Sequence, residues 1–244
     1  MVRRGATCVL LLAAVQFCGG CGPSVEPIEV GSGCPDQPLR GPQSSAVGEP
    51  DDQLIDDFED GNKTLAPEGD RDGSWILGQD FQTAALTAEV SSHCAARGKF
   101  AGHFAASGSS LWGNNWTAVF LATPTPIPPA VASQALPYDG SKYSAISFWA
   151  AFGGNNGPLF QVPMGLTTMD NAWNSNGCTV CNDFYAAKVP LSHSWQRFVI
   201  RFDRMAQSGT GNPLVPMRRD QLVGFIIWPR QQFDIWIDDV RFEL

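Results

Sequence analysis

The sequence predicts an all-β protein: a single jelly-roll β-sandwich domain that follows a signal peptide and a linker rich in proline and glycine. Two observations predict this class. Short apolar segments alternate at period two and are separated by turns rich in Gly, Pro and Asn, with no long helical period between them. The chain is also 43% hydrophobic and only 16% charged, with 8 Trp and 15 Phe. Such a chain buries enough apolar surface to offset the entropy of ordering, which excludes intrinsic disorder.

The expected strands are the segments in which every second residue is apolar. In the clearest of them Phe198, Ile200 and Phe202 share one face, while Arg197 and Arg201 share the other. The same alternation predicts strands over residues 99–106, 144–152, 197–202, 222–228 and 233–242. A short helical turn is expected at 203–207.

The N-terminus has the pattern of an export signal. Two arginines precede an apolar segment at residues 9–15, which is too short to span a bilayer. Gly19 and Gly20 then precede Cys21, which is similar to the lipobox of bacterial lipoproteins, although Cys18 stands where Leu is usual. We expect residues 1–20 to be a lipoprotein signal peptide and Cys21 to carry the lipid; the alternative is cleavage without a lipid.

These features predict an exported lipoprotein held at a membrane of the cell envelope or at the cell surface. Residues 21–51 are rich in Pro, Gly and Ser and read as a flexible linker, and residues 52–244 form the predicted sandwich. Loss of the signal peptide removes two arginines and no acid, so the net charge falls from −8 to −10. A nucleic-acid partner is therefore not expected, because phosphate binding needs a surplus of Lys and Arg.

Four cysteines remain beyond the lipidation position, and an even number in an exported chain predicts two disulfides. Cys34 lies in the linker and indicates that part of it docks on the domain. Cys178 and Cys181 are separated by two residues in a polar loop, where a disulfide within the pair or from the pair to Cys94 would staple the loop. A zinc site that combines this pair with His193 is the alternative.

Acidic residues gather at both ends of the predicted domain. Ten of the 24 acids lie between residues 49 and 72, and the last expected strand carries Asp238 and Asp239 between apolar neighbours. If the first and last strands are neighbours, Glu59 meets one of these two aspartates. Carboxylate oxygens suit Ca²⁺, which takes six to eight oxygen ligands. The alternative is a solvated acidic loop and an unrelated strand end.

Three segments resemble a known family. They are Leu54-Ile-Asp-Asp-Phe-Glu-Asp-Gly-Asn62, Trp195-Gln-Arg-Phe198 and Phe233-Asp-Ile-Trp-Ile-Asp-Asp-Val-Arg-Phe242. Together they are similar to the galactose-binding-like jelly-roll carbohydrate-binding modules, family eleven in particular, over residues 52–244.

The resemblance implies a structural calcium ion where the N-terminal acidic turn meets the final strand. Its expected ligands are first Glu59 and Asp238, then Asp239 and the backbone at Gly61. The ion would join strands and take no part in catalysis.

The resemblance also implies a sugar site, which needs aromatic faces to stack on pyranose rings and amides to bond hydroxyl groups. Trp149, Trp195 and Trp236 lie in apolar strands and are expected in the core. The candidate ligand-binding residues are Trp112, Asn115, Trp116, Trp173, Asn174, Tyr185 and Trp228.

We therefore expect non-catalytic binding of a polysaccharide or glycoconjugate. The alternative from another class is a structural or protein-interaction lipoprotein without a sugar site. A glycoside hydrolase or lyase is less favoured, because the sequence carries no nucleophile elbow, metalloprotease motif, P-loop or dinucleotide fingerprint. His103 lies in an alternating strand and is expected to be packed there and not to act as a base.

Overall fold

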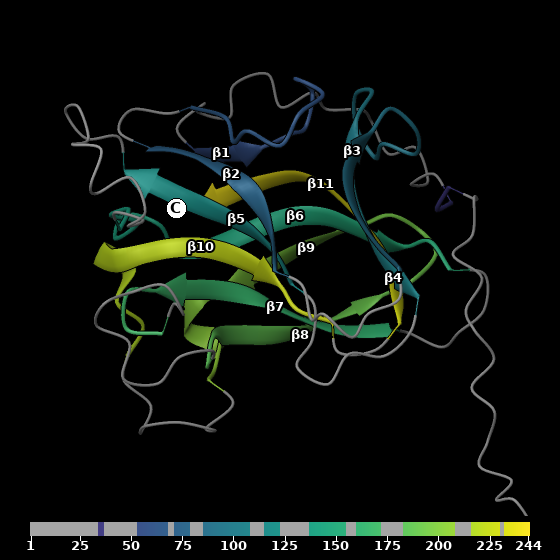
Figure 1. Ribbon diagram of the computed structural model, residues 1–244. Coiled ribbons are helices and arrows are strands. Elements are labelled where there is room, and N and C mark those ends of the chain that lie inside the picture. Colours follow the sequence, from purple (N-terminus) through teal and green to yellow (C-terminus); the bar gives the residue numbers. More distant parts are fainter. Residues whose placement is uncertain are drawn as a thin grey trace, which may run out of the picture.

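The protein is a sandwich of two antiparallel sheets packed face to face (Figure 1). The computed structural model describes residues 34–36, 53–67, 71–78, 85–107, 115–122, 137–154, 160–171, 183–207, 216–229 and 232–244. Within these residues the regular structure consists of strands and two short 3₁₀ turns, η2 (Phe202–Arg204) and η3 (Arg219–Gln221). The predicted all-β jelly roll is confirmed, and η2 begins one residue before the expected helical turn.

One sheet has six strands, with β1 attached to the end of β11. Its order is β3 (Ala85–Ser91), β4 (Ala101–Ser107), β11 (Phe233–Glu243), β6 (Ala145–Phe152) and β9 (Gln196–Arg201), and β1 (Leu54–Asp56) also pairs with β11. The predicted juxtaposition of first and last strands is present, because Leu54 is opposite Arg241 and Asp56 is opposite Val240.

The other sheet has five strands. Its order is β2 (Arg71–Gly78), β5 (Asn115–Ala122), β10 (Leu222–Ile227), β7 (Phe160–Thr168) and β8 (Tyr185–Leu191). Both 3₁₀ turns are single turns, and no helix among the described residues is long and apolar enough to cross a membrane.

Aromatic rings fill the space between the sheets. Trp116 is completely buried at its centre, with its ring 4.6 Å from that of Trp75 and 6.1 Å from that of Phe58. A Cβ atom on Gly102 of the facing sheet would lie 2.7 Å from the Trp116 ring. Gly102 and Phe104 share the inward face of β4. Position 102 needs glycine because the Trp116 indole occupies the space where a side chain would lie.

A second, smaller apolar cluster lies on the outer face of the six-stranded sheet. Trp195 and Trp236 are 3% and 5% exposed, and they pack with Ala101 and Ala151 and against Cys94. These two tryptophans are buried as expected, but beneath the segment between β3 and β4 and not between the sheets. Alternation explains this, because Ile235 and Ile237 on either side of Trp236 point into the main core.

Several sequence-based assignments lie outside the described residues. These are the signal peptide at residues 1–20, the lipidation of Cys21 and most of the linker at 21–51. They stay predictions. Residues 34–36 of the linker are described, and they are docked on the domain, as the position of Cys34 indicated.

Candidate functional site

The outer face of the five-stranded sheet is defined by strand register. Phe225, Leu166 and Tyr185 lie side by side across β10, β7 and β8 and point into the core. Their chain neighbours therefore point outward. One row of outward positions runs across the whole sheet and consists of Ile76, Thr117, Ile226, Gly165 and Ala186.

Two aromatic rings meet on this outer face, which we call the aromatic face. Phe184 and Trp228 each lie next to an inward core residue, and their ring centroids are 5.2 Å apart with the planes at 79°. Both side chains are half-buried. They approach from β8 and β10 across the intervening strand β7, where the outward position is Gly165. A Cβ atom on Gly165 would lie 1.9 Å from the Tyr185 carbonyl oxygen, so glycine at this position allows the backbones of β7 and β8 to approach closely.

The aromatic face is buried at its centre and exposed at the edge strand β2. Ile226 is 3% exposed, whereas Ile76 on the edge strand β2 is 51% exposed. Polar groups lie near the rings. The Thr117 hydroxyl donates to Asn115 Oδ1 at 3.1 Å, and Lys188 is exposed on the other edge strand. The face thus combines apolar ring surface with amide, hydroxyl and ammonium groups.

The predicted ligand-binding residues do not all share this face. Trp228 and Asn115 lie on it, as required. Trp116 is a core residue with no exposed surface, because β5 begins at Asn115 and alternation then turns Trp116 inward. Tyr185 is 5% exposed and also points inward, beside a cavity of about 520 Å³ at the edge between β8 and β9. Trp112, Trp173 and Asn174 lie outside the described residues.

Phe184 is a residue of the aromatic face that the sequence prediction missed. The signal for it is in the sequence. Val189 and Leu191 are the apolar alternate residues of β8, so Tyr185 shares their inward parity and Phe184 has the outward one. Tyr185, the more polar aromatic residue of the adjacent pair, faces the core instead.

The two expected calcium ligands from opposite ends of the domain contact one segment. Glu59 Oε1 accepts hydrogen bonds from the backbone N–H groups of Lys99 and Phe100 at 2.7 and 3.0 Å. Asp238 Oδ2 accepts one from the N–H of Arg97 at 2.8 Å. The distant acids are therefore brought together on residues 97–100, the turn that leads into β4.

Asp239, the next expected ligand, contacts two arginine side chains. Its Oδ2 atom lies 2.5 Å from Arg97 Nη1, and its Oδ1 atom accepts a hydrogen bond from Arg241 Nε at 2.6 Å. Both carboxylate oxygens are therefore held by guanidinium groups. Gly61 has a φ of 72° and closes a turn through its N–H to the Phe58 carbonyl at 2.9 Å. Its backbone conformation thus supports the acidic turn.

Asp238 carries the feature that fits a cation. Its side chain is buried, and among the described residues its Oδ1 atom has no hydrogen-bond partner. Burial, with a smaller contribution from the neighbouring Asp239 charge, raises the pKa of the Asp238 carboxyl to about 8. No three Asp, Glu, His or Cys side chains among the described residues gather as a metal-binding group. We propose that Asp238 and Glu59 hold a structural Ca²⁺ together with backbone carbonyls.

Asp56 connects the first strand to the opposite sheet. Its Oδ2 atom accepts a hydrogen bond from Trp75 Nε1 at 2.7 Å, and its Oδ1 atom accepts one from the N–H of Phe58 at 2.7 Å. Burial raises the pKa of this carboxyl to about 7 despite the two donors. The group is a buried structural carboxyl, and it links β1 of the six-stranded sheet to β2 of the five-stranded sheet.

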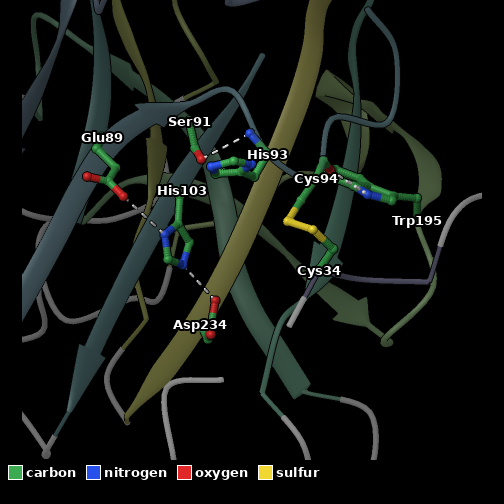
Figure 2. The surroundings of a disulfide bond; sticks show 8 residues. All are labelled: Cys34, Glu89, Ser91, His93, Cys94, His103, Trp195 and Asp234. Atoms are coloured by element: carbon green, nitrogen blue, oxygen red, sulfur yellow. Dashed lines mark hydrogen bonds and ion pairs between the residues drawn. A yellow bond between two sulfur atoms is a disulfide. The ribbon is translucent and has the colours of Figure 1, made fainter. Parts of the chain in front are cut away.

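His103 lies between two carboxylates on the outer face of the six-stranded sheet (Figure 2). Its Nε2 atom is 2.9 Å from Asp234 Oδ1, and its Nδ1 atom is 3.8 Å from Glu89 Oε1. The ring stacks on Trp236 with centroids 4.0 Å apart. His103 is 9% exposed, as expected for a packed residue. The three polar groups come from β3, β4 and β11 and tie these strands together.

The structure pairs Cys34 with Cys94, with the two Cα atoms 4.9 Å apart. This corrects the alternative in which Cys94 bonds to the Cys178–Cys181 pair. The expected bond within the Cys178–Cys181 pair lies outside the described residues. His193, the proposed zinc ligand, packs its ring against Phe152 at 5.7 Å.

Comparison with known proteins places this fold among carbohydrate-binding modules. No family model matches the sequence, and no curated protein matches it significantly. The family 11 module of a cellulosomal cellulase of Clostridium thermocellum superposes with a TM-score of 0.50, at 15% identity over 82% of this chain and 96% of that one.

Two further structures are similar at lower scores. A Clostridium thermocellum family 11 module solved with a β-1,3-1,4-mixed-linked tetrasaccharide has a TM-score of 0.49 at 14% identity, covering 78% of this chain and 94% of that one. A family 30 carbohydrate-binding module has a TM-score of 0.44 at 12% sequence identity, covering 69% of this chain and 90% of that one. The fold is thus the jelly roll of family 11 carbohydrate-binding modules, as the terminal motifs predicted.

The raised pKa of Asp56 predicts a specific pH dependence of stability. Because the folded state holds the proton more tightly than the unfolded chain, the contribution is complete below pH 3.8 and is lost as the pH rises through about 7. The free energy of unfolding should fall by up to about 1.4 kcal/mol per pH unit in this window. In Asp56→Asn this slope should be smaller than in the wild type in urea unfolding between pH 4 and 7, and the remaining slope comes from Asp238, whose pKa is also raised. Parallel pH profiles for the two proteins would show that Asp56 ionises normally.

The calcium proposal predicts a metal-dependent melting temperature. Added Ca²⁺ should raise the melting temperature by several degrees over a chelator-treated sample, since a ligand that binds only the folded state stabilises it. Asp238→Asn should abolish the difference. Asp203→Asn is the matched control, because that carboxylate is exposed and paired with Arg201, and it should keep the full response. Identical melting of the wild type with and without Ca²⁺ would remove the metal from the account.

Proposed function

We propose that this protein binds a polysaccharide or glycoconjugate on its aromatic face, without catalysis. The observation that carries the proposal is the Phe184–Trp228 pair, two half-buried rings in contact on the outside of a sheet. Aromatic rings on the outer surface of a rigid sheet provide apolar area for the C–H faces of sugar rings. The jelly-roll fold shared with a carbohydrate-binding module supports the same function.

The surroundings of the rings supply the hydrogen-bonding part of sugar recognition. Asn115 and Thr117 lie on the neighbouring strand β5, and Lys188 lies beyond the rings on β8. Sugar hydroxyl groups both donate and accept hydrogen bonds, and these three side chains offer donors and acceptors of both kinds. All of them project from strands and not from long loops, so little conformational entropy is lost when a ligand binds.

The position of the protein in the cell is a separate part of the proposal. An N-terminal signal followed by a lipid on Cys21 would anchor the domain to a membrane of the cell envelope, so that it holds a glycan at that surface. Support for this part comes from the sequence pattern at residues 1–21.

A protein-interaction role is the second candidate. Ile76 and Leu77 are 51% and 36% exposed on the edge strand β2, and exposed apolar side chains at a sheet edge also suit a protein contact. In that case the aromatic face would bind no sugar, and Ile76→Ser would weaken capture of the protein partner. Glycan binding therefore separates the two functions.

The test is binding to a panel of soluble and insoluble polysaccharides. Trp228→Ala and Phe184→Ala should each weaken binding about tenfold or more, because each removes one ring from the contact, and a tenfold loss corresponds to 1.4 kcal/mol. Tyr185→Phe is the matched control, since its ring points into the core and its change should leave affinity within about twofold. Trp173→Ala tests the predicted loop residue in the same assay.

Two results would overturn the sugar-binding proposal. One is a wild-type protein that retains no polysaccharide of the panel. The other is a Trp228→Ala variant that melts normally and binds as tightly as the wild type. Near-ultraviolet circular dichroism of every variant separates lost binding from lost folding.

A further inference from the structure

Residues 34–36 of the N-terminal segment are docked on the domain. The residues that they contact lie far from β1 in the sequence. The Asp36 N–H donates to the His193 carbonyl at 2.8 Å, and the Trp195 N–H donates to the Asp36 carbonyl at 3.3 Å. Asp36 forms a parallel bridge with Ser194, directly before the edge strand β9. Pro35 is buried. The segment therefore adds a short piece of strand beside the start of β9.

A covalent bond and an indole reinforce this docking (Figure 2). Cys34 is bonded to Cys94, and the Cys94 carbonyl accepts a hydrogen bond from Trp195 Nε1 at 3.0 Å. Cys94 has a φ of 68°, a backbone conformation uncommon for a residue other than glycine. Trp195 thus contacts both segments that the disulfide joins. Its backbone N–H binds Asp36, and its ring binds the loop that carries Cys94. We call Cys34–Asp36 with Cys94 the N-terminal clip.

The N-terminal clip lies on the side of the sandwich opposite the aromatic face. Cys94 packs against Trp195 and Trp236, which form the apolar cluster on the outer face of the six-stranded sheet. Phe184 and Trp228 lie on the outer face of the five-stranded sheet. Both sheets, which pack about 10 Å apart in such folds, therefore separate the clip from the rings.

The clip also shortens the path from the N-terminus to the domain. Twelve residues separate Cys21 from Cys34, and the thirteen Cα–Cα steps of an extended chain between them reach at most about 45 Å. The next attachment to the domain among the described residues is the pairing of Leu54 in β1, for which the same limit becomes about 110 Å. The clip thus reduces the maximum reach by more than half and fixes the side from which the chain leaves.

We propose that the N-terminal clip orients the domain, so that whatever surface holds the N-terminus faces the six-stranded sheet and the aromatic face points away from it. The value of this orientation for glycan capture rests on the proposed function, whereas the orientation itself does not. A polymer too large to pass between the domain and its anchoring surface would still reach Phe184 and Trp228.

The test measures which face lies near the N-terminus. A gadolinium chelate is attached to the amino end of the chain from residue 22 onward, which keeps every described residue, and backbone amide relaxation is recorded by NMR. The paramagnetic enhancement should be several-fold stronger at Arg197 and Val199, on the outer face of the six-stranded sheet, than at Thr117 and Ala186. Equal enhancement on the two faces of the wild type would overturn the proposal, with no variant needed.

The double variant Cys34→Ser/Cys94→Ser tests the role of the covalent bond. Its difference between the faces should fall several-fold, while its affinity for a soluble glycan stays within about twofold of the wild type. Asp203→Asn is the control variant and should keep the wild-type pattern. A double variant with unchanged asymmetry would show that the disulfide does not set the orientation. Asymmetry in a protein that binds no glycan would retain the clip and reject only the proposed function.

Discussion

The pairing of β11 with three other strands is the constraint on which the rest of the structure depends. β11 bonds to β6 along one side, and along the other side to β4 and then to β1. This single strand therefore joins the first and last parts of the domain. It also places Asp234 beside His103 and Asp238 at the turn before β4. A register shift of one residue in β11 would turn Ile235 and Ile237 outward and point Asp234 and Asp238 into the core. Burying these carboxylates there without partners would be strongly destabilising.

The outer faces of the two sheets differ in what covers them. The outer face of the six-stranded sheet is closed by a second apolar cluster and by the N-terminal clip. The outer face of the five-stranded sheet carries Phe184 and Trp228, two half-buried side chains whose rings pack edge to face. In the proposed function, attachment and recognition therefore lie on opposite sides of one thin sandwich.

Much of the fold could be predicted from the sequence, because alternation is a local property. Segments such as 197–202 and 233–242 carry it clearly, and the motifs at both ends predicted the neighbouring strands. The site was predicted less well. Trp116 is core because β5 starts one residue before it, a boundary that local sequence does not mark. Asp239 is neutralised by Arg97 from a distant turn, and the pairing of Cys34 with Cys94 spans 60 residues; both depend on tertiary structure.

The central claim, that the aromatic face is where a glycan binds, is tested most directly by mapping a bound oligosaccharide with NMR. Titration of a ligand found in the polysaccharide panel should shift the amide signals of Thr117, Ile226 and Ala186 and the indole signal of Trp228. The signals of Arg197 and Val199 on the opposite sheet should stay in place. Shifts confined to that opposite sheet would contradict the account.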